Sequence, residues 1–132
     1  MPRKPASFRP HHQPTRQEQN REYDSRRGSF RERGYSTHWD VAALAFRRVH
    51  PLCLGCEAIG RVKPSALVDH VIPHKGDQGL MWDQANWQAC CQWHHDVVKQ
   101  RLEQYYETKR IRAEDLRLDS EPAKRLTRHL NA

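Results

Sequence analysis

Residues 66–72 read Ala-Leu-Val-Asp-His-Val-Ile, and this stretch decides the fold that we expect. Polar residues are set between β-branched ones, which is a composition typical of a β-strand. Pro73 follows at once and closes the strand, because proline has no N–H to donate to a neighbouring strand. After a loop-like stretch at residues 73–85, residues 86–90 (Asn-Trp-Gln-Ala-Cys) favour a second short strand. The two segments predict a small two-stranded hairpin.

Helices are predicted on both sides of this hairpin. Before it, apolar residues recur at helical spacing and form one face of a helix: Trp39, Ala42, Ala43, Phe46 and Val49. Thr37 is a suitable N-cap with Asp40 three residues later, and Pro51 ends this helix at about His50. After the hairpin, the stretch from about Gln92 to about Lys109 lacks glycine and proline and favours a long helix. The expected fold class is therefore α+β.

The totals are those of one small domain with a modest core. The chain has 132 residues, of which 36% are hydrophobic, and its mean hydropathy is −1.03. Such a chain buries limited apolar surface, so an additional staple such as a bound metal is plausible. We expect the folded domain over residues 37–112 and a C-terminal helical extension over residues 113–132, with a short helix from about Ser120.

The charge favours a polyanionic partner, with nucleic acid first. The net charge is +7, the sequence pI is about 9.6, and residues 1–38 hold nine Lys and Arg against four Asp and Glu. Residues 1–36 are rich in Arg, Gln, Pro and Ser and are predicted to be a disordered basic tail. This tail is either an arm that finds DNA non-specifically or a solubilising segment.

The chain is expected to be cytoplasmic, with no membrane partner. It has no apolar run of membrane-spanning length, and its basic N-terminus lacks the apolar stretch of a secretion signal. Disulfides are disfavoured in that compartment. The four cysteines, two of them spaced as C-x2-C, therefore indicate metal binding: Cys53, Cys56, Cys90 and Cys91.

Two short ligand pairs predict a structural zinc. Cys53 and Cys56 supply the first pair, and Cys91 and His94 supply the second with the same spacing. Tetrahedral zinc is commonly held by two such pairs, and the 34 residues between them can contain the hairpin. Two alternatives stay open in the second pair: Cys90 in place of Cys91, or His95 in place of His94. Cys91 with His94 is preferred because it keeps the spacing and leaves His95 for another role.

A second set of residues has the chemistry of phosphodiester hydrolysis. Asp69 and His70 lie on the first predicted strand, Asn86 begins the second, and His95 lies on the following helix. A carboxylate and an imidazole, here Asp69 and His95, can hold a divalent ion with positions open for phosphate and water. A neutral imidazole such as that of His70 can take a proton from water near pH 7. Within a strand, Asp69 and His70 are expected to point to opposite faces.

These motifs together closely resemble the HNH endonuclease family, especially small phage-encoded members that carry a zinc-knuckle pair. The resemblance covers roughly residues 35–100. It rests on residues 67–74 (Leu-Val-Asp-His-Val-Ile-Pro-His), Gly76-Asp77, Asn86-Trp87-Gln88 and Cys91-x2-His94-His95-Asp96, together with Thr37-x-Trp39, His50-Pro51-Leu52-Cys53 and Gly60-Arg61-Val62.

The resemblance implies a ββα-metal fold, with a hairpin packed on a helix around one divalent ion. It implies that His70 is the general base, that Asp69 and His95 bind the catalytic ion, and that Asn86 steadies the loop that orients His70. The ion would be Mg²⁺, or Mn²⁺, Ni²⁺ or Zn²⁺. The expected reaction is cutting or nicking of double-stranded DNA to leave 5′-phosphate and 3′-hydroxyl ends. One departure is His94, where these relatives usually have cysteine.

Further roles are assigned more loosely. His74 is a candidate for contacting the metal or a phosphate, or is simply solvated. Lys99 and Arg101 are candidates for contacting the DNA backbone, against the alternative of a solvated helix face. Trp82 and Trp87 are expected to pack the core.

Two further expectations concern partners. If the chain is phage-encoded, phage packaging proteins are possible partners in the host cytoplasm. The alternative to an enzyme is a zinc-stapled module that binds nucleic acid or a partner protein without cutting.

Overall fold

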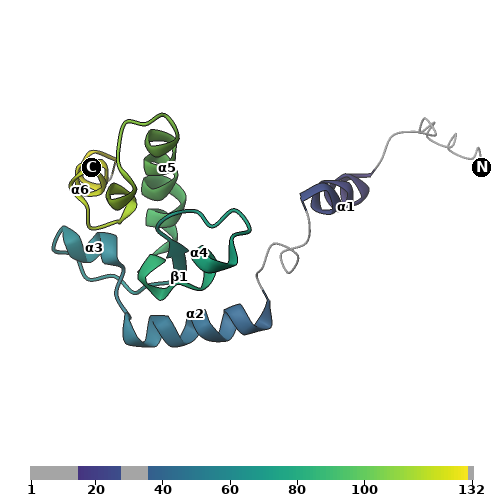
Figure 1. Cartoon of the computed structure of the whole chain (residues 1–132), viewed down its shortest axis with the longest axis horizontal. Helices are drawn as coiled ribbons and strands as arrows, with labels where there is room; N and C mark the ends of the chain where they lie inside the picture. Colours follow the sequence, from purple (N-terminus) through teal and green to yellow (C-terminus); the bar gives the residue numbers. More distant parts are fainter. Residues whose placement is uncertain (1–14, 28–35, 131–132) are drawn as a thin grey trace, which may run out of the picture.

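The computed structural model describes residues 15–27 and 36–130, and Figure 1 shows their arrangement. The elements are α1 (Arg16–Arg27), α2 (Thr37–Val49), α3 (Leu54–Ala58), β1 (Leu67–His70), α4 (Gln78–Trp82), η1 (Gln84–Asn86), β2 (Trp87–Cys90), η2 (His94–Lys99), α5 (Gln100–Glu107), η3 (Ala113–Leu116) and α6 (Glu121–Leu130). Mixed helices around one small sheet confirm the α+β class.

The sheet is an antiparallel hairpin of β1 and β2, as predicted, with each strand slightly shorter than expected. Leu67 pairs with Cys90 and Asp69 with Gln88, while the alternate residues of both strands face the other side. Val68 and Trp87 pack toward Trp39 of α2. The hairpin therefore lies between α2 on one face and the helix that follows β2 on the other.

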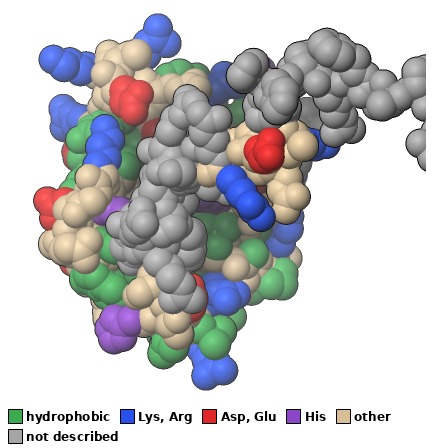
Figure 2. Space-filling model, turned by 90° about the vertical axis from the view of Figure 1, so that its right-hand side faces the viewer, with side chains coloured by type: hydrophobic (Ala, Val, Ile, Leu, Met, Phe, Trp, Pro, Cys, Tyr) green, Lys and Arg blue, Asp and Glu red, His purple; other side chains and the backbone are tan. Residues whose placement is uncertain are grey.

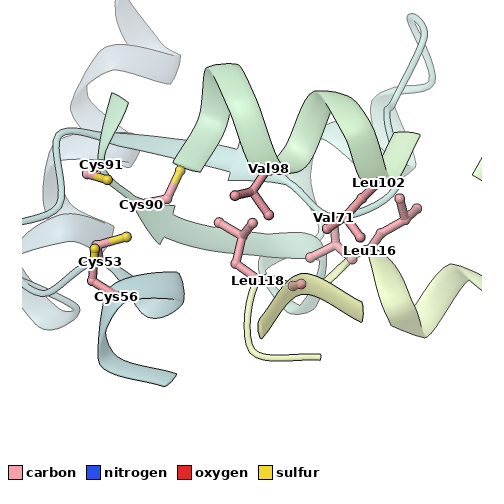
Figure 3. Packing of buried hydrophobic residues seen from close by; sticks show 10 residues of the cluster. Cys53, Cys56, Val71, Cys90, Cys91, Val98, Leu102, Leu116 and Leu118 are labelled. Atoms are coloured by element: carbon pink, nitrogen blue, oxygen red, sulfur yellow. The ribbon is translucent and has the colours of Figure 1, made fainter. Parts of the chain in front are cut away.

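The main core is on the second face. Leu67 and Cys90 pack there with Val98 of η2 and Leu102 of α5, which together form one long helix. Figure 3 shows Val98 and Leu102 beside Leu116 and Leu118. Leu116 and Leu118 are fully buried, together with Ala123 of α6. The segment that the sequence suggests is an extension after residue 112 thus shares the core of the domain.

The N-cap of helix α2 is one residue earlier than predicted. The side chain of Ser36, rather than Thr37, accepts from the backbone N–H of Trp39 at 3.4 Å. At the other end, Val49 is 74% exposed and does not belong to the packed face. The face that does pack contains Trp39, Ala42, Ala43 and Phe46.

Two regions expected to lack regular structure contain short helices. Within residues 73–85, Asp77 caps α4 by accepting from Leu80 N at 3.1 Å, and Asp83 caps η1 by accepting from Ala85 N at 3.0 Å. In the tail predicted to be disordered, residues 16–27 form α1.

The start of α1 is a capping box that was not predicted. Thr15 N–H donates to Glu18 Oε2 at 2.8 Å, and Glu18 N–H donates to Thr15 Oγ1 at 3.2 Å. The remainder of the predicted tail, residues 1–14 and 28–35, lies outside the described residues.

Because Leu116 is fully buried, Leu116→Ala should lower the free energy of unfolding by about 2–5 kcal/mol. Leu44→Ala is the matched control, since Leu44 is 42% exposed on α2, and it should change stability by less than about 1 kcal/mol. Urea unfolding of the metal-replete protein measures both values. Equal, small effects would show that residues after 112 are an appendage.

Candidate functional site

Three cysteines and one histidine converge between α3, the end of β2 and the start of η2. Cys53 immediately precedes α3 and Cys56 lies within it, Cys91 directly follows β2, and His94 is the first residue of η2. All four are buried, and their ligand atoms lie within 4.8 Å of one another. The structure therefore brings together the four residues that the spacing predicts as metal ligands.

The distances within this Cys3His group fit a tetrahedral ion. His94 Nδ1 is 3.5 Å from both Cys53 Sγ and Cys56 Sγ. It is 3.4 Å from Cys91 Sγ. Around a tetrahedral ion with bonds of about 2.3 Å to sulfur and about 2.0 Å to nitrogen, adjacent sulfur and nitrogen ligands are about 3.5 Å apart. The group can hold a structural metal, and three sulfurs with one imidazole are a donor set that suits zinc.

The hydroxyl of Thr127, in α6, selects the tautomer of His94. Thr127 Oγ1 donates to Ala123 O at 2.8 Å, so its lone pairs can accept from His94 Nε2, which is 3.1 Å away. Nε2 then carries the ring proton, and Nδ1 faces the sulfurs unprotonated, as a metal ligand requires. No sequence pattern indicates Thr127, because it is 33 residues from His94.

Gly55 lets the His94 ring approach α3. A Cβ at residue 55 would lie 2.2 Å from His94 Cδ2 and 2.5 Å from its Nε2. No side chain can be accommodated there without moving the imidazole. The glycine within Cys53-Leu54-Gly55-Cys56 is thus required by the packing of the Cys3His group.

The electrostatics of the group favour a bound cation. Burial and the nearby Cys53 and Cys91 thiols raise the pKa of Cys56 to about 12. Burial lowers the pKa of His94 to about 4, with smaller contributions from Lys63 and Arg61, so its imidazole is neutral. A dication would stabilise the thiolates that otherwise repel one another.

Cys90 is not a member of the group. It is fully buried in the core beside Val98 (Figure 3), and burial raises the pKa of its thiol. The alternative that places Cys90 in the metal site is therefore not supported.

Asp69 and His95 meet at the wall of a cavity of about 530 Å³. Asp69 Oδ1 lies 3.1 Å from His95 Nδ1. Burial by itself raises the pKa of Asp69, but the hydrogen bond with His95 and the charge of Lys99 outweigh it and hold that pKa below its usual value. The same hydrogen bond raises the pKa of His95. Two ligands at about 2.1 Å and 90° around an octahedral ion would be about 3.0 Å apart, so this pair also fits one divalent ion.

His70 lines the same cavity from the other face of β1. Its ring stacks on Trp39 with centroids 4.8 Å apart, and Nε2 lies 2.9 Å from Met81 O. Because a carbonyl only accepts, Nε2 carries the proton and Nδ1 is the basic nitrogen. Burial lowers the pKa of His70 although the bond to Met81 opposes it, so the imidazole is neutral at pH 7.

Asn86 connects the end of β1 to α4. Its side-chain oxygen accepts from Ile72 N at 2.8 Å, and its amide donates to Ile72 O at 2.9 Å and to Leu80 O at 3.2 Å. Leu80 precedes Met81, whose carbonyl holds His70. This geometry is compatible with a residue that positions His70 without touching substrate.

A π-helical stretch separates the roles of the neighbouring histidines. η2 is wider than an α-helix, and such turns are frequent at functional sites. His94 turns toward the cysteines, while His95 and Lys99 both reach Asp69. The sequence predicts the helix but not this local widening.

Lys99 is buried, so the interpretation that it lies on a solvated helix face is wrong, and its ammonium is not exposed for a contact with DNA. Its side chain is 1% exposed, and Nζ donates to His70 O at 2.7 Å and to Glu103 Oε1 at 2.8 Å. Arg101 is exposed, and its contact with DNA stays a prediction.

Gln88 links Asp69 to the C-terminal segment, a role that sequence reasoning missed. Its amide donates to Asp69 Oδ2 at 2.9 Å and to Leu116 O at 3.3 Å, and its oxygen accepts from Leu118 N at 2.9 Å. The signal was available in the register, because Asp69 and Gln88 are cross-strand partners on one face.

The remaining candidates are placed as follows. His74 lines the cavity, and its Nδ1 accepts from Gly76 N at 3.0 Å. Trp87 is buried and Trp82 is partly buried, and both pack edge-on against Trp39, which confirms their core role.

No protein-family model, curated protein or solved structure matches this chain. The HNH resemblance therefore rests on the sequence motifs. Among the described residues, no helix has the length and apolar character needed to cross a membrane.

If the Cys3His group holds zinc, the purified protein should contain about one tightly bound zinc per chain. Cys53→Ser removes one of the four ligands and should cause loss of the metal and of the fold. Cys90→Ser is the matched control, because Cys90 is equally buried but outside the group, and it should keep the zinc. Elemental analysis after gel filtration, with circular dichroism, measures both. Metal-free wild type that remains folded would contradict the zinc assignment.

Proposed function

We propose that this protein is a metal-dependent DNA endonuclease of the HNH type. The observation that carries the proposal is the meeting of Asp69 with His95 at 3.1 Å on the wall of a cavity that His70 also lines. A carboxylate–imidazole pair beside a separate neutral imidazole provides ion ligands and a base at one place.

The base in this proposal is His70. Its Nε2–H is held by Met81 O, and its ring rests on Trp39, so the orientation of Nδ1 is fixed before substrate binds. Its lowered pKa keeps Nδ1 free to accept a proton from the attacking water. Asn86 maintains this arrangement through Ile72 and Leu80.

Asp69 and His95 would hold the divalent ion, Mg²⁺ or a similar metal. When bound, such an ion neutralises phosphate charge and stabilises the departing oxygen. Among the described residues, no third metal-binding side chain lies close to both Asp69 and His95, since the Cys3His group is the sole close group of three or more. The remaining positions around the ion would therefore be open to water and phosphate. The expected products carry 5′-phosphate and 3′-hydroxyl ends.

The proposed substrate is double-stranded DNA. The net charge of +7 supports a polyanionic substrate. Figure 2 shows Lys and Arg side chains scattered over one face of the molecule, with fewer Asp and Glu side chains among them. In this proposal zinc in the Cys3His group has a purely structural part: it holds the helix that carries His95 against the hairpin.

Supercoiled plasmid incubated with the protein and Mg²⁺ or Mn²⁺ should be converted to nicked or linear DNA. His70→Ala should lower the rate by about 10²–10⁴-fold, because the base is lost. His129→Ala, which removes an exposed histidine of α6, should cut like wild type. DNA binding that is equal in wild type and His70→Ala, without cleavage by either, would instead indicate a binding module.

Cleavage at saturating Mg²⁺ should rise with pH and level off, with a midpoint below 6.5. The pKa of His70 lies below its usual value, so the imidazole is protonated and inactive only at lower pH and is a free base above it. Saturating ion minimises competition by protons at His95, whose pKa is raised. A midpoint well above 6.5 would argue against His70 as the base.

A further inference from the structure

Lys99 is a charged side chain that the proposed reaction does not use, although it is the largest fully buried side chain among the described residues. Its ammonium contacts three oxygens: His70 O at 2.7 Å, Glu103 Oε1 at 2.8 Å and Asp69 Oδ2 at 3.1 Å. Nζ donates hydrogen bonds to His70 and Glu103 and forms an ion pair with Asp69, and the side chain is 1% exposed. Lys99 therefore cannot act by donating to DNA.

The same contacts determine how Asp69 can bind an ion. Oδ2 faces Lys99 Nζ and accepts from Gln88 Nε2 at 2.9 Å. Oδ1 faces His95 Nδ1. The carboxylate thus presents one oxygen toward the ion position, while its second oxygen is committed to the protein.

Lys99 also balances charge in a place with little water. Asp69 is 5% exposed, and the side chain of Glu103 is 28% exposed. A buried carboxylate without a counter-charge is strongly unfavourable. Lys99 lies between the two carboxylates and compensates them when no divalent ion is present.

The same positive charge opposes a dication bound at Asp69. Like charges at such short range repel strongly where solvent screening is small. The ion therefore gains less from Asp69 than it would from a carboxylate without an ammonium beside it.

We propose that Lys99 is an internal counter-cation that keeps the Asp69–His95 site assembled without its divalent ion and weakens the binding of that ion. This inference rests on the proposed function, because it takes Asp69 and His95 as the ion's ligands. The negative charge of a DNA phosphate beside the ion would counteract the repulsion from Lys99, so the ion binds more tightly when DNA is present. Lys99 is a positioning residue that touches neither.

Calorimetric titration of the full-length, zinc-loaded protein with Mn²⁺, in the absence of DNA, tests this role. Lys99→Met should lower the Kd for Mn²⁺ by roughly tenfold or more, because the opposing charge is lost. Lys99→Arg keeps the charge and should stay near wild type. Glu103→Gln leaves the charge of Lys99 directed to Asp69 alone and should raise the Kd several-fold.

Lys75→Met is the matched control, since Lys75 lines the same cavity but is exposed. Its charge is screened by water, so its removal should change the Kd much less than Lys99→Met does. Thermal unfolding adds a second readout: Lys99→Met should have a lower Tm than wild type without Mn²⁺ and should recover more of it when Mn²⁺ is added.

A purely structural role for Lys99 predicts the opposite change in Kd, since loss of a structural residue would weaken Mn²⁺ binding. An unchanged or higher Kd in folded Lys99→Met overturns the proposal. If Lys99→Met does not fold even with Mn²⁺, Glu103→Gln decides, and an unchanged or lower Kd there overturns it. Absence of Mn²⁺ binding in every variant contradicts the ion site and with it the proposed function. Binding that is equal in wild type and Lys99→Met contradicts the role of Lys99 alone.

Discussion

Three sulfurs placed 3.4–3.5 Å from one imidazole nitrogen join segments that are far apart in the chain. Cys53 and Cys56 anchor α3, Cys91 follows the hairpin, and His94 opens the long helix. Little apolar surface is available to hold these segments, because the core is small. The start of the helix that carries His95 is therefore held by this convergence, while Val98 and Leu102 pack the rest of it into the core.

Asp69 is the point at which the hairpin, the long helix and the C-terminal segment share one polar network. Each of its oxygens has a partner: His95 at Oδ1, and Gln88 and Lys99 at Oδ2. Gln88 and Lys99 are in turn bound to backbone groups, and Lys99 is also bound to Glu103. Buried networks of this kind are stable when every member is satisfied and costly when one is missing. The site is consequently held by hydrogen bonds and charge as much as by packing.

Much of this arrangement could be predicted from local patterns. The hairpin followed from β-branched residues around Asp69, and the metal group followed from the repeated two-residue spacing of its ligands. What could not be predicted depends on contacts between distant segments. The burial of Lys99 depends on two carboxylates from different elements. The π-helical turn at 94–99 accompanies the contacts of His94 with the cysteines and of His95 with Asp69. The N-cap of α2 is Ser36 and not the predicted Thr37, because both residues are suitable caps and sequence alone does not choose between them.

The bonds from Gln88 to residues 116 and 118, and from His94 to Thr127, have a consequence for how the protein is made. A ribosome synthesises the chain from its N-terminus, so the ligands and the proposed base emerge well before the residues that orient them. An incomplete chain that ends near residue 112 would contain every residue of the proposed chemistry, but Gln88 would lack its partners at residues 116 and 118, and His94 would lack Thr127. The full set of these bonds can therefore form only after residue 127 has been synthesised, and a fragment released before that point would lack at least one of them.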